Sequence, residues 1–306
     1  MMVAPAQAEE PSFPIIYVTE RESSVVKFVA PAHFGNCAGA QVRAFSYHAI
    51  RCFARALAVA LLLTSLLAAS ASARTLAEIQ GRGLISMCAH PDALPHASDR
   101  PDAPGFQIEI GRALASALGF PLQVDWIVAR MRAGLVDCDL LLDTIADPDV
   151  QRGPVKLSHA YQKSGVALAL RPGNDAVQGF KDLRPEQRVG VMVGSVASVV
   201  LGKRGLHTVP YSFESEMVED LAKGTLDAGA VSPASIAYYI HAHPGAGLRF
   251  VHAYDAEPEL RWNLAVGLRR SDDALVAAVN AALDKLIDDG TLARIYARYG
   301  VDYRRP

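Results

Sequence analysis

The chain has 306 residues, and its 30 Lys and Arg against 32 Asp and Glu give a formal net charge of −2 at pH 7. This length suits one large domain or two smaller lobes. The near-neutral charge offers no electrostatic basis for binding nucleic acid, so we expect none. No internal repeat at solenoid spacing and no low-complexity tract is found in the sequence.

One long apolar run, Ala56–Ala69, begins more than fifty residues into the chain. Three arginines lie before the run, at Arg43, Arg51 and Arg55, and the small residues Ala71-Ser72-Ala73 follow it. These features are typical of a secretory signal peptide. The run is also shorter than the roughly 20 residues that a membrane span needs. We therefore expect cleavage near Ala73 and a mature protein that starts near Arg74 and works outside the cytoplasm.

The position of this signal makes the preceding residues unusual, because a signal peptide belongs at the N-terminus. We interpret residues 1–41 as a mis-called extension and 42–73 as the signal peptide, with translation starting near Val42. The alternative is a buried hydrophobic helix at 56–69. The basic and small-residue flanks favour the signal peptide.

Strand and helix patterns alternate after Arg74. Strands are predicted at 84–87, 122–127, 139–145 and 166–170, and helices at 106–119 and 129–136. In the first helix, Ile110, Leu114 and Leu118 share one apolar face, and Gly119 is a good C-terminal stop. Strand–helix–strand alternation predicts a mostly parallel sheet.

The pattern restarts after a linker at 171–182. Strands are predicted at 188–193, 208–210, 227–231, 249–253 and 263–269, and helices at 195–202, 213–223, 233–242, 272–286 and 290–299. Two such units in series predict an α/β protein with two lobes. Ligands of open α/β sheets bind beyond the carboxyl ends of the strands and between lobes.

The chain has four cysteines, of which Cys88 and Cys138 lie in the expected mature part. An even pair in an oxidising compartment is a disulfide candidate. Both residues lie at the edges of predicted neighbouring strands, so we predict that they pair. The alternative is two buried free thiols.

Four stretches, in order, carry a family resemblance: 105–114 (a Gly-Phe turn and helix), 188–195, 221–228 and 276–300. Together they resemble the periplasmic solute-binding proteins of family 3, the amino-acid-binding type that serves ABC transporters. The resemblance covers nearly all of residues 80–300.

This resemblance implies a type II periplasmic-binding-protein fold. Each lobe would be a mostly parallel sheet flanked by helices, and two hinge strands would join the lobes. Lobe 1 would comprise 74–167 plus 266–306, and lobe 2 would comprise 168–265. A small-molecule solute would bind in the cleft between the lobes and close it. We expect an ABC permease as partner, no cofactor, no metal and a monomer.

The resemblance also places candidate ligand contacts. Arg152 stands where the family pairs an arginine with a ligand carboxylate, a contact that two parallel hydrogen bonds make strong. The alternative is a surface arginine paired with Asp147 or Asp149. Gly194 and Ser195 precede a helix and offer an anion site, although an ordinary N-cap explains Ser195 equally well. Phe106, in the Gly-Phe turn, completes these contacts.

Two departures argue against an ordinary α-amino acid as ligand. Ser232 stands where amino-acid binders hold the ligand ammonium with an acidic residue, and a hydroxyl supplies no compensating charge. Asp147 stands where a hydroxyl residue is common, and its carboxylate would repel a ligand carboxylate or pair with Arg152. We therefore expect a different small polar or anionic solute.

A narrower resemblance fits these departures. The segments Cys88-Ala-His-Pro-Asp-Ala-Leu-Pro95 and Cys138-Asp139 are similar to those of accessory proteins of quinoprotein (methanol) dehydrogenase systems. An accessory or interaction protein for a periplasmic dehydrogenase is therefore the alternative function. The chain has Ser232-Pro233-Ala234 where those proteins have Trp-Gly-Pro, so this function ranks second.

Catalytic motifs are absent from the sequence: it has no nucleophile elbow, phosphate loop or His-Glu-x-x-His helix. His90 and His96, with Asp92 between them, are more typical of a plain loop than of a metal site. A few related proteins are periplasmic dehydratases, which need a carboxylic acid in the cleft. Glu109, Asp143, Asp147 and Glu214 are the candidates, and none is singled out. We expect a binding protein rather than an enzyme.

Overall fold

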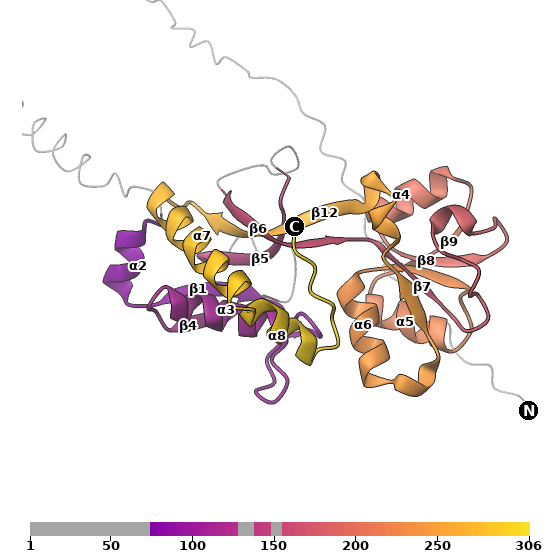
Figure 1. Ribbon diagram of the computed structural model, residues 1–306, viewed down its shortest axis with the longest axis horizontal. Coiled ribbons are helices and arrows are strands. Elements are labelled where there is room, and N and C mark those ends of the chain that lie inside the picture. Colours follow the sequence, from indigo (N-terminus) through magenta and orange to yellow (C-terminus); the bar gives the residue numbers. More distant parts are fainter. Residues whose placement is uncertain (1–73, 128–137, 148–154) are drawn as a thin grey trace, which may run out of the picture. The chain divides into compact units, whose positions relative to one another are not determined.

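The computed structural model describes residues 74–127, 138–147 and 155–306, which belong to one compact unit. Two five-stranded sheets organise these residues, each with its own helices (Figure 1). We refer to each sheet with its helices as a lobe. The predicted two-lobe α/β fold is confirmed. The expected extension (1–41), signal peptide (42–73) and helix at 129–136 lie outside the described residues.

The first lobe is built on the sheet β4-β1-β5-β12-β6. Its strands are β1 (Ile85–Ala89), β4 (Leu122–Trp126), β5 (Leu140–Ile145), β6 (Val155–Gly165) and β12 (Arg261–Arg269). Strand β1 pairs in parallel with β4 and β5, and β12 lies antiparallel between β5 and β6. Four strands therefore run in one direction and only β12 opposes them.

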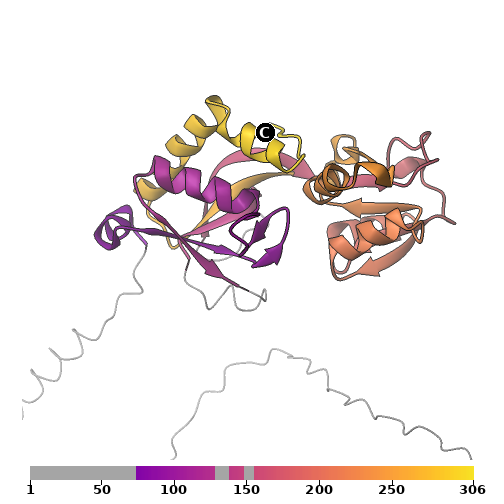
Figure 2. The ribbon, with the colours of Figure 1, turned by 90° about the horizontal axis from the view of Figure 1, so that it is seen from below.

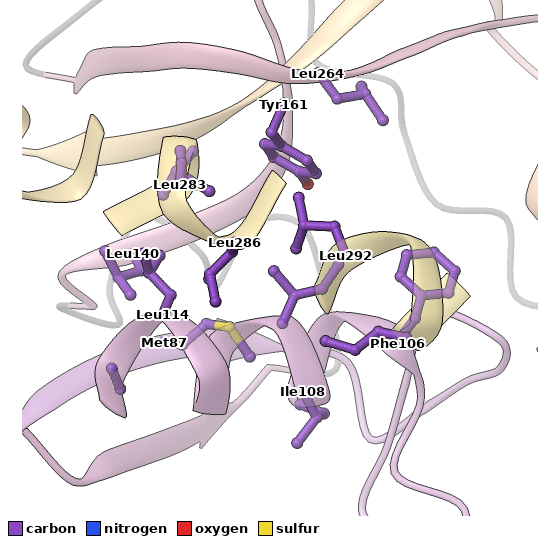
Figure 3. Close-up of a cluster of buried hydrophobic side chains, with 14 of the residues drawn as sticks. Met87, Phe106, Ile108, Leu114, Leu140, Tyr161, Leu264, Leu283, Leu286 and Leu292 are labelled. Carbon is purple, nitrogen blue, oxygen red and sulfur yellow. The ribbon is translucent and has the colours of Figure 1, made fainter. Parts of the chain in front are cut away.

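Four helices and a small hairpin complete this lobe. The helices are α2 (Leu76–Arg82), α3 (Phe106–Ala117), α7 (Asp273–Asp288) and α8 (Thr291–Arg298), and the hairpin strands are β2 (Asp92–Ala93) and β3 (Ala97–Ser98). Met87 of β1, Leu114 of α3 and Leu286 of α7 point toward one another in the core (Figure 3). Burying each such side chain contributes about 1.5–3 kcal/mol, so this apolar contact fixes the helices on the sheet.

The second lobe is built on the sheet β11-β7-β10-β8-β9. Its strands are β7 (Ala167–Leu170), β8 (Arg188–Met192), β9 (His207–Tyr211), β10 (Ala228–Val231) and β11 (Arg249–Val251), and its helices are α4 (Val196–Lys203), α5 (Glu214–Ala222) and α6 (Pro233–Ala242). Short 3-10 turns lie at Phe180–Asp182, Pro244–Ala246, Ala253–Asp255 and Pro258–Leu260. Here β7 alone opposes the direction of the other strands.

Two extended segments carry the chain between the sheets (Figures 1 and 2). Strand β6 continues almost directly into β7, and β12 returns to the first sheet. The crossing segments pair with each other, since Arg261 lies opposite Gly165 and Trp262 opposite Ser164. The predicted hinge strands correspond to these segments. The lobe limits at 167/168 and 265/266 stay predictions.

The C-terminal tail fastens these crossing strands to the second lobe. The Lys163 N–H donates to the Arg304 carbonyl at 2.8 Å. The Asp255 carboxylate pairs with Lys163 at 2.6 Å and with Arg304 at 2.8 Å. These two cations hold the pKa of Asp255 below its usual value, although burial alone would raise it. One carboxylate thus ties the tail and β6 together.

The sequence analysis missed the hairpin strands β2 and β3 and the short 3-10 turns, and it also missed two longer elements, α2 and β6. Helix α2 has a capping box in which Thr75 and Glu78 satisfy each other's backbone N–H groups, a Thr-x-x-Glu signal that was available. Strand β6 has no strict alternation of buried and exposed residues, because Ser158 and Tyr161 are buried whereas His159 between them is exposed. Its pairing with β12 is a long-range constraint that local pattern does not reveal.

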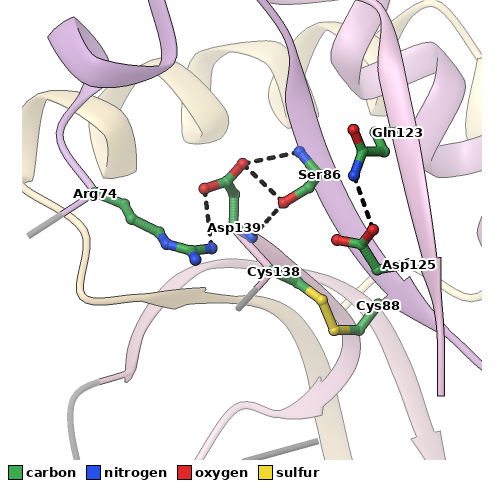
Figure 4. The surroundings of a disulfide bond; sticks show 7 residues. All are labelled: Arg74, Ser86, Cys88, Gln123, Asp125, Cys138 and Asp139. Atoms are coloured by element: carbon green, nitrogen blue, oxygen red, sulfur yellow. Dashed lines mark hydrogen bonds and ion pairs between the residues drawn. A yellow bond between two sulfur atoms is a disulfide. The ribbon is translucent and has the colours of Figure 1, made fainter. Parts of the chain in front are cut away.

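Cys88, in β1, and Cys138, just before β5, are joined by a disulfide whose Cα atoms are 5.5 Å apart (Figure 4). The two residues are separated by 50 positions in the sequence. Closing a loop of that length stabilises the fold by about 4 kcal/mol in the chain-entropy model.

Asp139, next to the disulfide, is fully buried and holds Arg74 and helix α2 on the sheet. Its carboxylate accepts from Arg74 at 3.2 Å and from Arg82 at 2.8 Å. The Ser86 N–H and hydroxyl also donate to it, at 2.8 and 3.0 Å. A buried carboxylate needs such partners because water is not available to solvate it.

We expect Asp139→Asn to lower the free energy of unfolding by about 3 kcal/mol, the low end for a broken buried ion pair, because Arg82 keeps solvent access. Urea denaturation of the oxidised protein measures this loss. Asp273→Asn is the matched control, because Asp273 pairs with Lys156 on the surface and is almost fully exposed. Equal urea midpoints for the two variants would contradict the assigned role of Asp139.

Candidate functional site

A polar cluster in the first lobe is centred on Asp143, near the carboxyl end of β5. Asp143 has a φ of +54°, in the left-handed region that residues other than glycine rarely adopt. Such backbone strain persists only where surrounding contacts impose it, and it concentrates at functional sites. The Asp143 N–H donates to the Tyr161 hydroxyl at 3.0 Å, which helps to hold this conformation.

Both carboxylate oxygens of Asp143 have partners within the chain. Oδ1 accepts from the Tyr161 hydroxyl. Oδ2 accepts from Nε2 of Gln107 at 2.5 Å and lies 3.3 Å from Nδ1 of His96. His96 is held by its ring contact with Phe106, at 4.8 Å between centroids. We call these four residues, His96, Gln107, Asp143 and Tyr161, the first-lobe cluster.

Opposite charges stabilise the ionised forms in this cluster. Burial alone would lower the pKa of His96, but the hydrogen bond and charge of Asp143, with a contribution from Glu214, raise it above its ordinary value. Burial would raise the pKa of Asp143, but His96, Tyr161 and Gln107 lower it. The pKa of Tyr161 is raised well above its ordinary value by burial and by the Asp143 charge. At a pH between the pKa of Asp143 and that of His96, the two side chains therefore form an imidazolium–carboxylate pair.

A second polar cluster surrounds Glu214, the first residue of α5. Its Oε1 accepts the Ser232 N–H at 2.8 Å. Its Oε2 accepts the hydroxyls of Ser232 at 2.7 Å and Ser235 at 2.5 Å. We call Glu214, Ser232 and Ser235 the second-lobe cluster. Ser232 caps α6, so the Glu214 carboxylate occupies the position that an anion takes at a helix N-terminus.

The structure shows where the predicted ligand contacts lie. Ser195 caps α4 by accepting the Ser198 N–H at 3.1 Å, and Gly194 precedes it with a φ of +69°. The N-cap alternative is thus realised, and the ligand role of both residues stays a prediction. Phe106 is only 1% exposed, lies in the first-lobe core and approaches the cluster through His96. Arg152 lies outside the described residues.

Asp147 lines a pocket beside the crossing strands. This pocket of about 560 Å³ is lined by Ala146, Asp147, Lys163, Arg261, Trp262, Asn263, Arg305 and Pro306. It does not include Ser195, Ser232 or Phe106. The structure therefore distributes the predicted contacts over the two lobes and the pocket.

Several cluster members were missed by sequence reasoning. Asp143 and Glu214 stood only among four undistinguished carboxylates, and His96 only as an unfavoured metal ligand. No local signal identified Gln107, Tyr161 or Ser235, because their roles depend on residues 18 to 36 positions away. Within the described residues, no group of three His, Cys, Asp or Glu side chains is placed to hold a metal ion. No helix in that part of the chain is long and apolar enough to cross a membrane.

We expect the stabilisation that His96 provides to depend on pH. Because its folded pKa is raised, this contribution is complete below pH 6.5 and is lost as pH rises through the folded value. The difference in unfolding free energy between the wild type and His96→Gln should therefore shrink from pH 5.5 to pH 8.5. Urea titrations at each pH measure it.

The control for this measurement is Asp143→Asn, because asparagine tolerates positive φ and removes the carboxylate charge. In the Asp143→Asn protein, the change in unfolding free energy caused by His96→Gln should lose most of its pH dependence. An unchanged pH dependence without the carboxylate would show that Asp143 is not the partner that matters.

The chain is similar in sequence to known binding proteins. It is 26% identical to a probable histidine-binding protein of Neisseria gonorrhoeae over 204 residues, or 64% of this chain and 74% of that protein. It is 24% identical over 210 residues to the lysine/arginine/ornithine-binding periplasmic protein of Escherichia coli (strain K12), covering 65% of this chain and 79% of that protein.

Solved structures share the fold. An ancestral cationic amino acid solute-binding protein (AncCDT-1) superposes with a TM-score of 0.61 at 21% identity, covering 73% of this chain and 98% of that one. MxaJ from Methlophaga aminisulfidivorans MPT superposes with a TM-score of 0.58 at 19% identity, covering 72% and 99%. The fold is thus the type II periplasmic-binding-protein fold implied by the sequence.

The model of one protein family matches residues 85–302, which include both sheets and both polar clusters. This match spans most of the described residues. The chain belongs to family 3 of the bacterial extracellular solute-binding proteins.

Proposed function

We propose that the protein captures a small polar solute in the periplasm, between its two lobes, and delivers it to an ABC permease. The observation that carries this proposal is the pair of polar clusters at the carboxyl ends of the strands in both lobes. Asp143 lies in the parallel strand β5 of the first lobe, two residues before its carboxyl end, and Glu214 follows β9 in the second lobe. Ligands of open α/β sheets bind at these ends.

An anionic solute requires a cation in the cleft, and Arg152 is the residue proposed for that role. The two described clusters contain the carboxylates of Asp143 and Glu214, which would not attract an anion. We therefore assign the solute carboxylate, if it has one, to Arg152 and to the Ser195 turn. Asp147, Ser232, Gly194 and Phe106 remain proposed neighbours of the solute.

Catalysis is not part of this proposal. A dehydratase needs a protonated carboxylic acid at neutral pH. The pKa of Asp143 is lowered by His96, Tyr161 and Gln107 against the effect of burial, so its carboxyl group is ionised there. The relatives named above are binding proteins. We propose a monomeric binding protein without a cofactor, exported by a signal peptide cleaved near Ala73.

A thermal-shift screen of the exported protein tests solute capture. The panel would contain amino acids, organic acids, amines and sugars. A solute at about 100 times its dissociation constant adds roughly 2.7 kcal/mol of stability, which raises the unfolding midpoint by about 5–10 °C for a protein of this size. A panel in which no class raises the midpoint would contradict solute capture.

Arg152→Ala should weaken binding of a carboxylate-bearing solute by about 10- to 100-fold, because a charge-assisted hydrogen-bonded pair contributes about 1.5–3 kcal/mol. Isothermal titration calorimetry with the solute found in the screen measures this loss. Arg112→Ala, at an exposed position of α3, is the control and should bind normally. Full affinity of the Arg152 variant would remove this residue from the site.

The second candidate function is an accessory protein of a periplasmic quinoprotein dehydrogenase. The disulfide between Cys88 and Cys138 favours it, because it joins the two segments that carry the narrower resemblance. Co-purification from the native host tests this function. Recovery with a dehydrogenase and a cytochrome c, together with a flat solute screen, would support it. Recovery with a permease would support import instead.

A further inference from the structure

Large apolar side chains are exposed at one edge of each sheet. In the described part of the chain, six such residues are between 37% and 66% exposed: Trp126, Ile145, Val193, Val196, Val199 and Phe213. Single exposed apolar residues are ordinary in soluble proteins. Here, however, all but Val199 lie where a strand ends or where the helix after it begins. Their placement therefore requires an explanation.

In the second lobe these residues share one edge. Strands β8 and β9 are parallel, and their last residues, Met192 and Tyr211, lie opposite each other. The Val193 N–H then donates to the Tyr211 carbonyl at 2.9 Å. Phe213 follows two residues after Tyr211, so it lies at the same carboxyl edge as Val193. Val196, the first residue of α4, follows within three residues.

The first lobe repeats this arrangement. Trp126 is the last residue of β4 and lies opposite Ala89, the last residue of β1. Ile145 is the last residue of β5, which pairs in parallel with β1 on its other side. Trp126 and Ile145 thus lie at the carboxyl edge of this sheet.

Polar groups of the candidate site adjoin these apolar residues in the chain. Val193 and Val196 flank the Gly194-Ser195 turn, and Phe213 directly precedes Glu214. In the first lobe, Ile145 lies two residues after Asp143. We call Trp126, Ile145, Val193, Val196 and Phe213 the apolar rim.

The polar groups already have partners, and this limits what they offer to a ligand. Asp143 is bonded to Tyr161, Gln107 and His96, and Glu214 to Ser232 and Ser235. A solute that replaces these hydrogen bonds with its own gains little, since one set is exchanged for another. The side chains of the apolar rim give up no hydrogen bonds when a solute buries them. Their burial by an apolar group of the solute is therefore favourable.

We propose that the solute of this protein combines a polar head group with an aliphatic or aromatic body, and that the apolar rim binds the body. This inference rests on the proposed function and specifies its ligand class. The polar clusters orient the head group, whereas the rim supplies most of the affinity. Each methylene that the rim buries should tighten binding about fourfold.

Calorimetry on the full exported protein tests this assignment with three matched series. The zwitterions are glycine, leucine and phenylalanine, the anions are acetate and phenylacetate, and the amines are ethylamine and phenethylamine. Within any series whose head group binds, the compound with the largest apolar body should bind at least about tenfold more tightly than the compound with the smallest. Equal affinity along every binding series would overturn the inference and leave solute capture intact.

Three variants identify the surface responsible. Phe213→Ser and Val196→Ser should weaken the large members about three- to tenfold and leave the small members unchanged. Val199→Ser is the matched control, because Val199 is as exposed as Val196 but lies one turn further along α4. Equal unfolding midpoints confirm that the variants fold. Serine at Phe213 also suits the N-cap of α5.

The remaining outcomes also decide the question. No binding by any member of the three series would overturn the inference. Solute capture itself would be overturned only if the wider thermal-shift panel were flat as well. Unchanged solute affinity in Phe213→Ser and Val196→Ser, combined with loss of a co-purifying protein, would assign the rim to a protein partner and overturn the inference.

Discussion

The insertion of β12 into the first sheet is the constraint on which the rest of the structure depends. This strand comes from the last sixth of the chain, yet it lies between β5 and β6 and pairs with both. The chain must therefore leave the first sheet along β6, build the whole second lobe, and return. The first sheet is thereby completed by long-range pairing. The helices α7 and α8, which follow β12, then cover the core that α3 began.

Local pattern accounts for the elements that have their own signals. The apolar faces of α3 and α7 and the glycine stops after helices predicted their ends to within a few residues. Strand β6 could not be found in this way, because its residues are specified by pairing with β12 about 100 positions later. The alternation of strands and helices indicated two lobes, but the return of the chain to the first lobe followed from family resemblance, since alternation does not determine where β12 inserts.

The site was harder to foresee for the same physical reason. A helix start such as Ser195 or Ser232 is visible in sequence, and both residues do cap helices. Whether a carboxylate fills such a cap depends on another element, here Glu214 of α5. Likewise, Asp143 differs from other carboxylates only through Tyr161, Gln107 and His96, which come from three separate segments. Sequence therefore identified hydroxyl and acidic candidates but not their pairing.

The disulfide has a consequence for when the site becomes complete. Cys88 leads into the loop that carries His96, and Cys138 leads into β5, which carries Asp143. The cross-link thus joins the two segments whose side chains meet in the first-lobe cluster. Before oxidation, only the intervening chain of about 50 residues limits how far these segments separate. The arrangement therefore links the first-lobe cluster to a bond that forms and persists only in an oxidising compartment.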